Sequence, residues 1–257
     1  MKITRKEFLR GLGLSALAAG AGKALATLSP GASAARATKT PAPGQRWGMA
    51  IDFMKCRADD GCNQCLSACR RAHNVPDIPD PAHEVKWIWK EPFEKVFPMQ
   101  QNDFTRAAYA GHPLPLLCNH CTNPACTRVC PTQATWKRDD GVVMMDWHRC
   151  IGCRYCMAAC PYGSRSFNWV DPRKYLSELN PDFPTRTKGV VEKCNFCEER
   201  LAQGKTPACV EKCEQQALVF GDLNDPNSPI RALLKSRYAI QRQPELGTGP
   251  AVYYVIG

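Results

Sequence analysis

The sequence predicts an α+β fold in which short strands and short helices alternate with many loops. Three observations lead to this prediction. The 257 residues include 16 cysteines and 21 prolines, both well above average use. The cysteines fall into four sets of four, and the stretches between them show short runs of strand or helix periodicity. We therefore expect the fold to be organised by what the cysteines bind, rather than by one large apolar core.

Residues 1–34 have the features of an export signal. A basic flank, TRKEFLRG, precedes a Gly- and Ala-rich apolar stretch, LGLSALAAGAG, and A-x-A sites end at Ala26 and Ala34. The flank is similar to a twin-arginine signal, which exports folded, cofactor-loaded proteins, but the pair here is Arg5-Lys6. We expect a Tat-like signal and a periplasmic protein; a disordered basic tail is the alternative.

Two stretches predict short strands. Residues 141–150, GVVMMDWHRC, alternate in side-chain direction as they run toward a cysteine set. Residues 83–90, HEVKWIWK, place Val85, Trp87 and Trp89 on one face of a strand. We expect these side chains to pack over a metal centre, with a partner interface as the alternative.

Other segments predict a helix, loops and a linker. Residues 197–204, CEERLAQG, predict a short helix that Gly204 can end. The Pro- and Asp-rich residues 74–83 and 224–229 predict loops, and residues 35–46 predict a linker. After the signal, no stretch reaches the roughly 18 apolar residues of a membrane-spanning helix, so we expect partners to hold the protein at a membrane.

The sixteen cysteines leave none over when they are grouped by spacing. Set one is Cys56, Cys62, Cys65 and Cys69; set two is Cys118, Cys121, Cys126 and Cys130; set three is Cys150, Cys153, Cys156 and Cys160; set four is Cys194, Cys197, Cys209 and Cys213. Set three, C-x2-C-x2-C-x3-C-P, has the bacterial ferredoxin spacing, in which three thiolates hold one [4Fe–4S] cluster and the fourth holds another. Set two repeats this scheme with a longer middle spacer. The sequence therefore predicts four [4Fe–4S] clusters.

Reciprocal ligation between sets gives the expected ligands. Cluster A takes Cys56, Cys62, Cys65 and Cys213; cluster B takes Cys69, Cys194, Cys197 and Cys209; cluster C takes Cys118, Cys121, Cys126 and Cys160; cluster D takes Cys130, Cys150, Cys153 and Cys156. Clusters C and D then define a ferredoxin-like domain at residues 113–170. It is inserted into a discontinuous ferredoxin-like domain, residues 47–112 and 171–229, with clusters A and B. Residues 230–257 remain as a C-terminal tail.

Cys56 has the least regular spacing of the predicted ligands. Five residues, RADDG, separate it from Cys62, where a ferredoxin run has two. We expect Cys56 to be a ligand, because without it cluster A is incomplete. The alternatives are a three-iron cluster and an oxygen ligand from Asp59 or Asp60.

Disulfides, zinc binding and nucleic-acid binding are the other interpretations of the cysteines and of the positive charge. Disulfides are common in exported proteins, but C-x2-C-x2-C crowds thiols without a sensible bridge framework. Zinc suits a C-x2-C pair, so a zinc-binding interaction module is the alternative of another class. The formal charge of +10 is offset by the signal and by thiolate-bound clusters, and we expect no nucleic-acid partner.

Polar residues near the cysteines are expected to be secondary. His120, between Cys118 and Cys121, is expected beside the cluster or facing solvent rather than as a ligand. Arg128, Arg154 and Lys193 can raise potentials locally, but are expected to be solvated charges. No phosphate-binding loop, nucleotide fingerprint or nucleophile elbow is present in the sequence, so we expect no small-molecule substrate site and no enzymatic activity of this chain's own.

From about Trp47 onward, the chain resembles a known family. HRCIGCRYCMAACPYGSRSF, RTKGVVEKCNFCEERL, ALVFGDLNDPNSP and ELGTGPAVYYV are similar to the four-cluster, ferredoxin-like electron-transfer subunits of the dimethylsulfoxide, polysulfide and tetrathionate reductase group. The resemblance implies the same interleaved pairing of sets one with four and two with three. It also implies single-electron transfer between a quinone-interacting membrane subunit and another redox partner.

Within this family, residues 59–98 are most similar to the periplasmic iron–sulfur subunit of the membrane complex linked to dissimilatory sulfite reductase. This likeness implies a role in sulfur metabolism, in sulfite reduction or sulfur oxidation. It implies as partners a polytopic quinone-interacting membrane subunit, a multihaem cytochrome c and other redox subunits. The alternative within the family is the electron-transfer subunit of a periplasmic molybdopterin reductase of the polysulfide or tetrathionate type.

Overall fold

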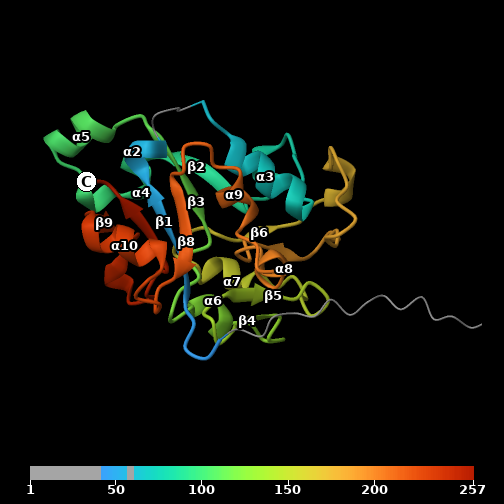
Figure 1. Ribbon diagram of the computed structural model, residues 1–257. Helices are drawn as coiled ribbons and strands as arrows, with labels where there is room; N and C mark the ends of the chain where they lie inside the picture. Colours follow the sequence, from blue (N-terminus) through green and yellow to red (C-terminus); the bar gives the residue numbers. More distant parts are fainter. Residues whose placement is uncertain (1–41, 57–60) are drawn as a thin grey trace, which may run out of the picture. The chain divides into compact units, whose positions relative to one another are not determined.

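Four strands from distant parts of the chain form the largest sheet (Figure 1). β1 (Trp47–Asp52) lies between β8 (Leu218–Asp222) and β10 (Val252–Val255), and β9 (Ala239–Ile240) pairs with β10. β1 is antiparallel to β8 and parallel to β10, with Met49 opposite both Phe220 and Val252. The sheet thus joins the start and the end of the part that the computed structural model describes, residues 42–56 and 61–257.

Helix α10 (Pro229–Ser236) covers one face of this sheet. Its Ile230 is fully buried against Ala50 and Val255. A Cβ on Gly221 of β8 would lie 3.0 Å from Ile230 Cγ2, so the glycine permits this close approach. Residues 230–257, which the sequence predicts as a tail, therefore supply most of α10 and the strands β9 and β10.

The opposite side of the sheet faces the largest apolar core. The antiparallel strands β2 (Ile88–Pro92) and β3 (Pro113–Leu117) contribute to it, together with α4 (Phe93–Val96). α5 (Asp103–Tyr109) lies beside α4. Core side chains include Met49, Ile51, Phe53, Phe93, Leu114, Leu116 and Tyr254. The same core contains Cys65, Cys118, Cys194 and Cys209, so cysteines of different sets converge on it.

The remaining elements are short. The remaining strands form two antiparallel pairs, β4 (Thr135–Lys137) with β5 (Val143–Met145), and β6 (Ser166–Phe167) with β7 (Val191–Glu192). The α-helices are α2 (Phe53–Cys56), α3 (Gln64–His73), α6 (Ala125–Arg128), α7 (Tyr155–Ala158), α8 (Glu198–Leu201) and α9 (Ala208–Glu211). Single 3-10 turns are η2 (Pro81–His83), η3 (Pro98–Gln100), η4 (Pro172–Tyr175) and η5 (Pro244–Leu246). The prediction of a mixed α and β fold built from short elements is confirmed.

The strands and the helix expected from the sequence are present, although one strand begins later than expected. The strand expected at residues 83–90 begins only at Ile88, because η2 and an irregular stretch precede it. Trp87 and Trp89 are buried, 1% and 8% exposed, which confirms packing and contradicts the partner-interface alternative. The strand expected within residues 141–150 and the helix ending before Gly204 are confirmed as β5 and α8.

A smaller aromatic core lies behind α3. Trp87 packs on His73 and Phe183 at ring-centroid distances of 4.7 and 5.9 Å. The Arg186 guanidinium lies over Trp87 and pairs with Glu192 of β7 at 2.7 Å, both side chains fully buried. This buried ion pair ties the segment around residue 186 to β7.

The described residues all belong to one unit, residues 38–257. The predicted export signal lies outside the described residues, as do most of the predicted linker and Asp59 and Asp60. The division of residues 47–229 into two interleaved ferredoxin-like domains stays a prediction.

Candidate iron–sulfur centres

All sixteen cysteines lie within the described residues, and each is a free thiol there. Several stand at the ends of short elements: Cys56 ends α2, Cys118 follows β3, and Cys197 precedes α8. All sixteen are buried or half-buried. A group of buried, unbridged thiols in a protein of this size indicates a metal-binding rather than a disulfide framework.

The predicted ligands of cluster C lie close together. Burial and the neighbouring Cys118 thiol raise the pKa of Cys121 to about 12, and Cys126 and Cys160 act in the same direction. For Cys160, burial followed by the Cys118 thiol raises the pKa. The structure therefore brings Cys160 of set three to the first three cysteines of set two.

Three of the four predicted ligands of cluster D are also neighbours. Cys156 packs in an apolar group with Cys130 and Cys150, and Cys153 stands on the same loop as Cys150. Burial pushes the pKa of Cys130 upward, but hydrogen bonds from the Thr132 hydroxyl and backbone amides outweigh it and lower the pKa. Such donors stabilise a thiolate, which is the form that ligates iron.

The predicted ligands of cluster B come from α3 and the segments around α8 and α9. Burial raises the pKa of Cys69 well above its usual value, and the thiols of Cys197, Cys194 and Cys209 raise it further. Cys197 has φ of +54°, in the left-handed region, as the residue before α8. The neighbouring backbone amides turn toward sulfur: Phe196 N lies 3.4 Å from Cys194 Sγ, and Ala208 N lies 3.4 Å from Cys197 Sγ.

The predicted ligands of cluster A include Cys56. Burial raises the pKa of Cys65 to about 12, with Cys56 as the largest charge contribution and Cys213 and Cys62 as smaller ones. The Ala217 amide donates to Cys213 Sγ at 3.2 Å. Despite the long spacer before Cys62, the Cys56 thiol thus lies near Cys65, as do Cys213 and Cys62.

The predicted ligands of clusters A to D are called groups A to D below. Thiols of successive groups also lie near one another. Cys65 of group A is among the charges that raise the pKa of Cys69 and Cys209 of group B, after burial. Cys118 of group C is the first charge acting on buried Cys194 of group B, whose pKa is about 12. Cys126 of group C packs in the same apolar group as Cys156 of group D and helps to raise its pKa, after burial. The four groups therefore follow one another in the order A, B, C, D.

The thiols and their surroundings fit [4Fe–4S] clusters. Each predicted ligand set offers four sulfurs, and backbone N–H groups point at several of them, as iron–sulfur sites require. A lone zinc ion also takes four thiolates, but three-cysteine runs shared between paired sites match the ferredoxin arrangement.

Two cations near the thiols are buried, Lys193 and Arg165. Lys193 is 1% exposed, and its Nζ donates to the backbone oxygens of Val143 and Cys194. The expectation that Lys193 is a solvated charge is wrong, because the segment that follows strand β7 carries it into the core. Arg128 and Arg154 are exposed as expected, and Arg154 lies 4.7 Å from the Trp169 ring centroid.

Arg165 was not singled out by the sequence. It is 5% exposed, and its Nη2 lies 3.0 Å from Cys126 Sγ and 2.9 Å from Thr135 Oγ1. Nothing in spacing or composition separates it from the exposed arginines nearby. Its burial follows from the way the turn after set three meets the β4–β5 hairpin.

His120 is fully buried rather than facing solvent. Its ring stacks on Phe196 at 3.7 Å, and its Nδ1 accepts from the Val143 amide at 3.0 Å. Burial, followed by the charges of Lys193, Arg46 and Arg165, holds the pKa of His120 well below its usual value. A neutral packing role beside cluster C replaces the solvent-facing role that the sequence left open.

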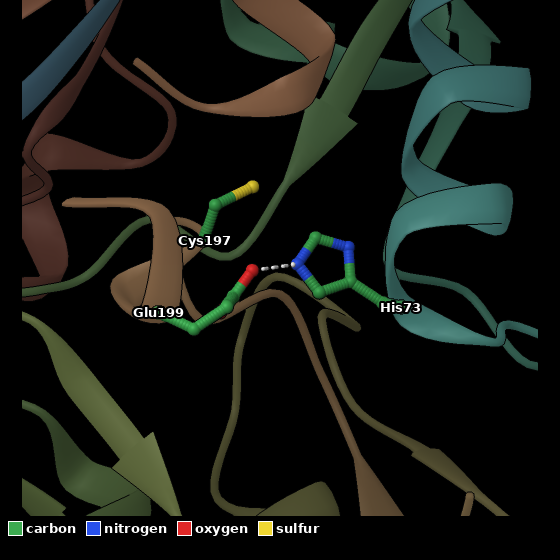
Figure 2. Close-up of side chains that lie close together, drawn as sticks. All are labelled: His73, Cys197 and Glu199. Atoms are coloured by element: carbon green, nitrogen blue, oxygen red, sulfur yellow. Dashed lines mark hydrogen bonds and ion pairs between the residues drawn. The ribbon is translucent and has the colours of Figure 1, made fainter. Parts of the chain in front are cut away.

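A second histidine, His73, stands beside the predicted cluster B (Figure 2). Its Nε2 lies 2.9 Å from Glu199 Oε1, and its Nδ1 lies 3.1 Å from Cys69 O and 3.6 Å from Cys69 Sγ. His73, Glu199 and the Cys197 thiol lie within 4.8 Å of one another, a spacing that suits a metal ion. Because Cys197 is already a predicted iron ligand, we interpret His73 and Glu199 as polar side chains that line the site of cluster B and do not bind iron. Sequence spacing gave no sign of this pair, since 126 positions separate its members.

No helix within residues 42–56 and 61–257 is both long and apolar enough to cross a bilayer.

Comparison with known proteins gives the family. The sequence profile of the 4Fe-4S dicluster domain matches residues 110–174 and 179–223. The Hdr-like menaquinol oxidoreductase iron-sulfur subunit 1 of Archaeoglobus fulgidus is 41% identical, over 82% of this chain and 83% of its own length. The iron-sulfur cluster-binding subunit of menaquinone reductase from Nitratidesulfovibrio vulgaris is 39% identical, over 82% and 88%. A tetrathionate reductase subunit of Salmonella typhimurium is 35% identical, over 99% and 89%.

Proposed function

This chain belongs to the family of iron–sulfur electron-transfer subunits of menaquinol oxidoreductases and of the dimethylsulfoxide and tetrathionate reductase group, and we propose that it carries four [4Fe–4S] clusters in series. Like its relatives, it is an electron-transfer subunit of an oxidoreductase complex rather than the catalytic one. Each bound cluster accepts and releases one electron. In our proposal, electrons pass between a quinone-interacting membrane subunit and another redox partner.

One observation carries this proposal: thiols of the four predicted ligand sets lie near one another in the order A to D. Between groups A and B, the near thiol is Cys65. Between B and C, the near thiols are Cys118 and Cys194. Between C and D, they are Cys126 and Cys156. A series of closely spaced centres is what single-electron transfer through a protein needs. The ligand sets A to D given above are part of the proposal.

The protein around the thiols excludes water and fixes their positions. Cys69, Cys194 and Cys209 are buried, and backbone amides donate to Cys194 and Cys213. Burial and hydrogen bonds to sulfur are the means by which a protein sets the potential of an iron–sulfur cluster. In our proposal, these residues neither make nor break a bond of a substrate.

The partners and the location are proposed from the relatives and from the sequence. Two relatives are subunits of a menaquinol oxidoreductase and a menaquinone reductase, which supports a quinone-interacting membrane subunit. We extend this to a multihaem cytochrome c and other redox subunits, and to a role in sulfite reduction or sulfur oxidation. The Tat-like signal at residues 1–34 supports a periplasmic location.

The second candidate is the electron-transfer subunit of a molybdopterin reductase. It is favoured by the likeness to the tetrathionate reductase subunit, which extends over 99% of this chain. Purification of the native complex from membranes separates the two. A multihaem cytochrome c in the complex supports the first candidate, and a large pterin-containing subunit supports the second.

Electron transfer is tested on the same native complex. Addition of a reduced menaquinone analogue is expected to bleach the visible iron–sulfur absorption of this subunit, or an oxidised analogue to restore it after reduction. A complex in which the quinone neither reduces nor reoxidises the iron–sulfur clusters would contradict the proposed partner. Failure of the isolated subunit to show any iron–sulfur absorption would contradict the proposed cofactor.

A further inference from the structure

Arg165 is a buried cation whose described partners include no carboxylate. Its guanidinium contacts Cys126 Sγ and Thr135 Oγ1, and its Nη1 lies 3.8 Å from Met145 Sδ. Within residues 42–56 and 61–257, no salt bridge joins Arg165 to Asp or Glu. A guanidinium stays protonated in proteins, so a full positive charge is held in the interior.

Arg186 shows what a structural buried arginine looks like in this chain. Its charge is compensated by Glu192 at 2.7 Å, and its other donors reach the backbone oxygens of His73 and Asn74. Burying an unpaired charge is costly, and the cost is offset only by an opposite charge nearby. For Arg165, the negative groups at hand are the thiolates.

Those thiolates belong to two different predicted clusters. Burial lowers the pKa of Arg165, but the charges of Cys126, Cys156 and Cys118 outweigh burial and raise it. Cys126 and Cys118 are predicted ligands of cluster C, and Cys156 is a predicted ligand of cluster D. The direct contact at 3.0 Å is with Cys126, so cluster C feels the charge most strongly.

We propose that Arg165 is the positioning residue that raises the reduction potential at the junction of clusters C and D, with the larger effect on C. This inference rests on the ligand sets of the proposed function. Reduction adds one negative charge to a cluster, and a fixed positive charge in a low-dielectric interior favours that added charge. The N–H···S hydrogen bond to Cys126 acts in the same direction, because it withdraws charge from the sulfur.

The junction therefore has a built-in preference for the electron. β4 holds the guanidinium through the Thr135 hydroxyl, and β5 holds it through Met145, so the charge is fixed in place. The charge makes cluster C easier to reduce than the same cluster would be without Arg165. Without the charge, the difference in reduction potential between clusters C and D would depend on the thiols and backbone amides alone.

The test is a redox titration of the purified, cluster-loaded protein followed by EPR. A Cys121→Ser variant identifies the signal of cluster C. The Arg165→Gln variant removes the charge, and we expect the reduction equilibrium of cluster C to fall at least tenfold, a shift of about 59 mV for one electron. A smaller shift in the same direction is expected at cluster D, and none at clusters A and B.

Matched variants separate charge from packing. Arg165→Lys keeps the charge and is expected to retain most of the potential. Met145→Glu leaves Arg165 in place but puts a carboxylate against it, as Glu192 does for Arg186; it is expected to lower the potential of cluster C as Arg165→Gln does. Met145→Leu, which adds no charge, is its control and is expected to leave the potential unchanged.

Two outcomes overturn the inference. One is an Arg165→Gln protein with full iron content and four EPR signals in which cluster C titrates as in the unaltered protein. The other applies if Arg165→Gln does not fold: it is an iron-loaded Met145→Glu protein in which the reduction potential of cluster C is unchanged. Failure of the proposed function looks different, because the unaltered protein itself would then lack four-iron signals.

Discussion

The large sheet and the cysteine loops of sets two and three are stabilised in different ways. In the sheet, Ala50, Ile230 and Val255 are fully buried and backbone pairing runs across four strands. Around sets two and three, α6 and α7 have four residues each, the hairpin β4–β5 has three-residue strands, and buried positions hold thiols and a guanidinium. Hydrophobic burial accounts for the sheet, whereas the loops depend on metal ligation.

Iron removal is the largest expected change that distinguishes the two regions. Stripping the clusters under reducing, chelating conditions should abolish amide-exchange protection in residues 118–130 and 150–160, because the iron–thiolate bonds that fix these loops are lost. β1 and β10 should keep part of their protection, since their pairing and apolar contacts need no metal. Hydrogen exchange with mass spectrometry measures both regions at once. Equal protection of both regions in the iron-free protein would contradict the comparison.

The buried ion pair of Arg186 and Glu192 should give the next largest effect. A Glu192→Gln variant leaves the Arg186 charge uncompensated in a fully buried site and should lower the free energy of unfolding by about 3–5 kcal/mol. Denaturant unfolding of the cluster-loaded protein measures this loss. Glu84→Gln breaks the partly exposed pair with Lys86 and should cost less than about 1 kcal/mol. A similar cost for both variants would show that Arg186 finds other compensation.

A cavity in the sheet region should change stability without changing redox properties. Ile230→Ala removes a fully buried side chain between α10 and the sheet and should cost about 2–5 kcal/mol. The EPR titration of the same variant should match that of the unaltered protein, because the side chain packs against strands and not against thiols. Leu246→Ala, at a position that is 52% exposed, is the control and should be neutral. A cluster potential that moves in Ile230→Ala would mean that the two regions are coupled.

Cys56→Ala should produce the smallest of these changes. Cys56 is half-buried at the end of α2 and close to Cys65, so its loss should convert cluster A to a three-iron cluster and remove about one iron of sixteen. Iron analysis and the EPR spectrum of the oxidised protein report this conversion. Cys65→Ala, at a buried ligand, should instead abolish cluster A. A Cys56→Ala protein that keeps every four-iron signal would show that Cys56 is not a ligand.

Much of the site could be predicted from the sequence because cluster ligation is encoded locally. Four cysteines at C-x2-C-x2-C-x3-C spacing predict an iron–sulfur loop whatever surrounds them. The burial of Arg165 and Lys193, and the approach of His73 to Glu199, depend on contacts between segments far apart in the chain. The place of β10 was missed for the same reason, since its partner β1 lies about 200 positions earlier. Local patterns thus predicted the ligands, while the charges around them required the fold.

The central claim, four [4Fe–4S] clusters on sixteen cysteines, is tested most directly by iron and zinc analysis combined with spin-quantified EPR during a redox titration of the purified protein. We predict about 16 Fe per chain and four separate one-electron [4Fe–4S] transitions. About four zinc ions per chain, with no EPR signal at any potential, would contradict this claim.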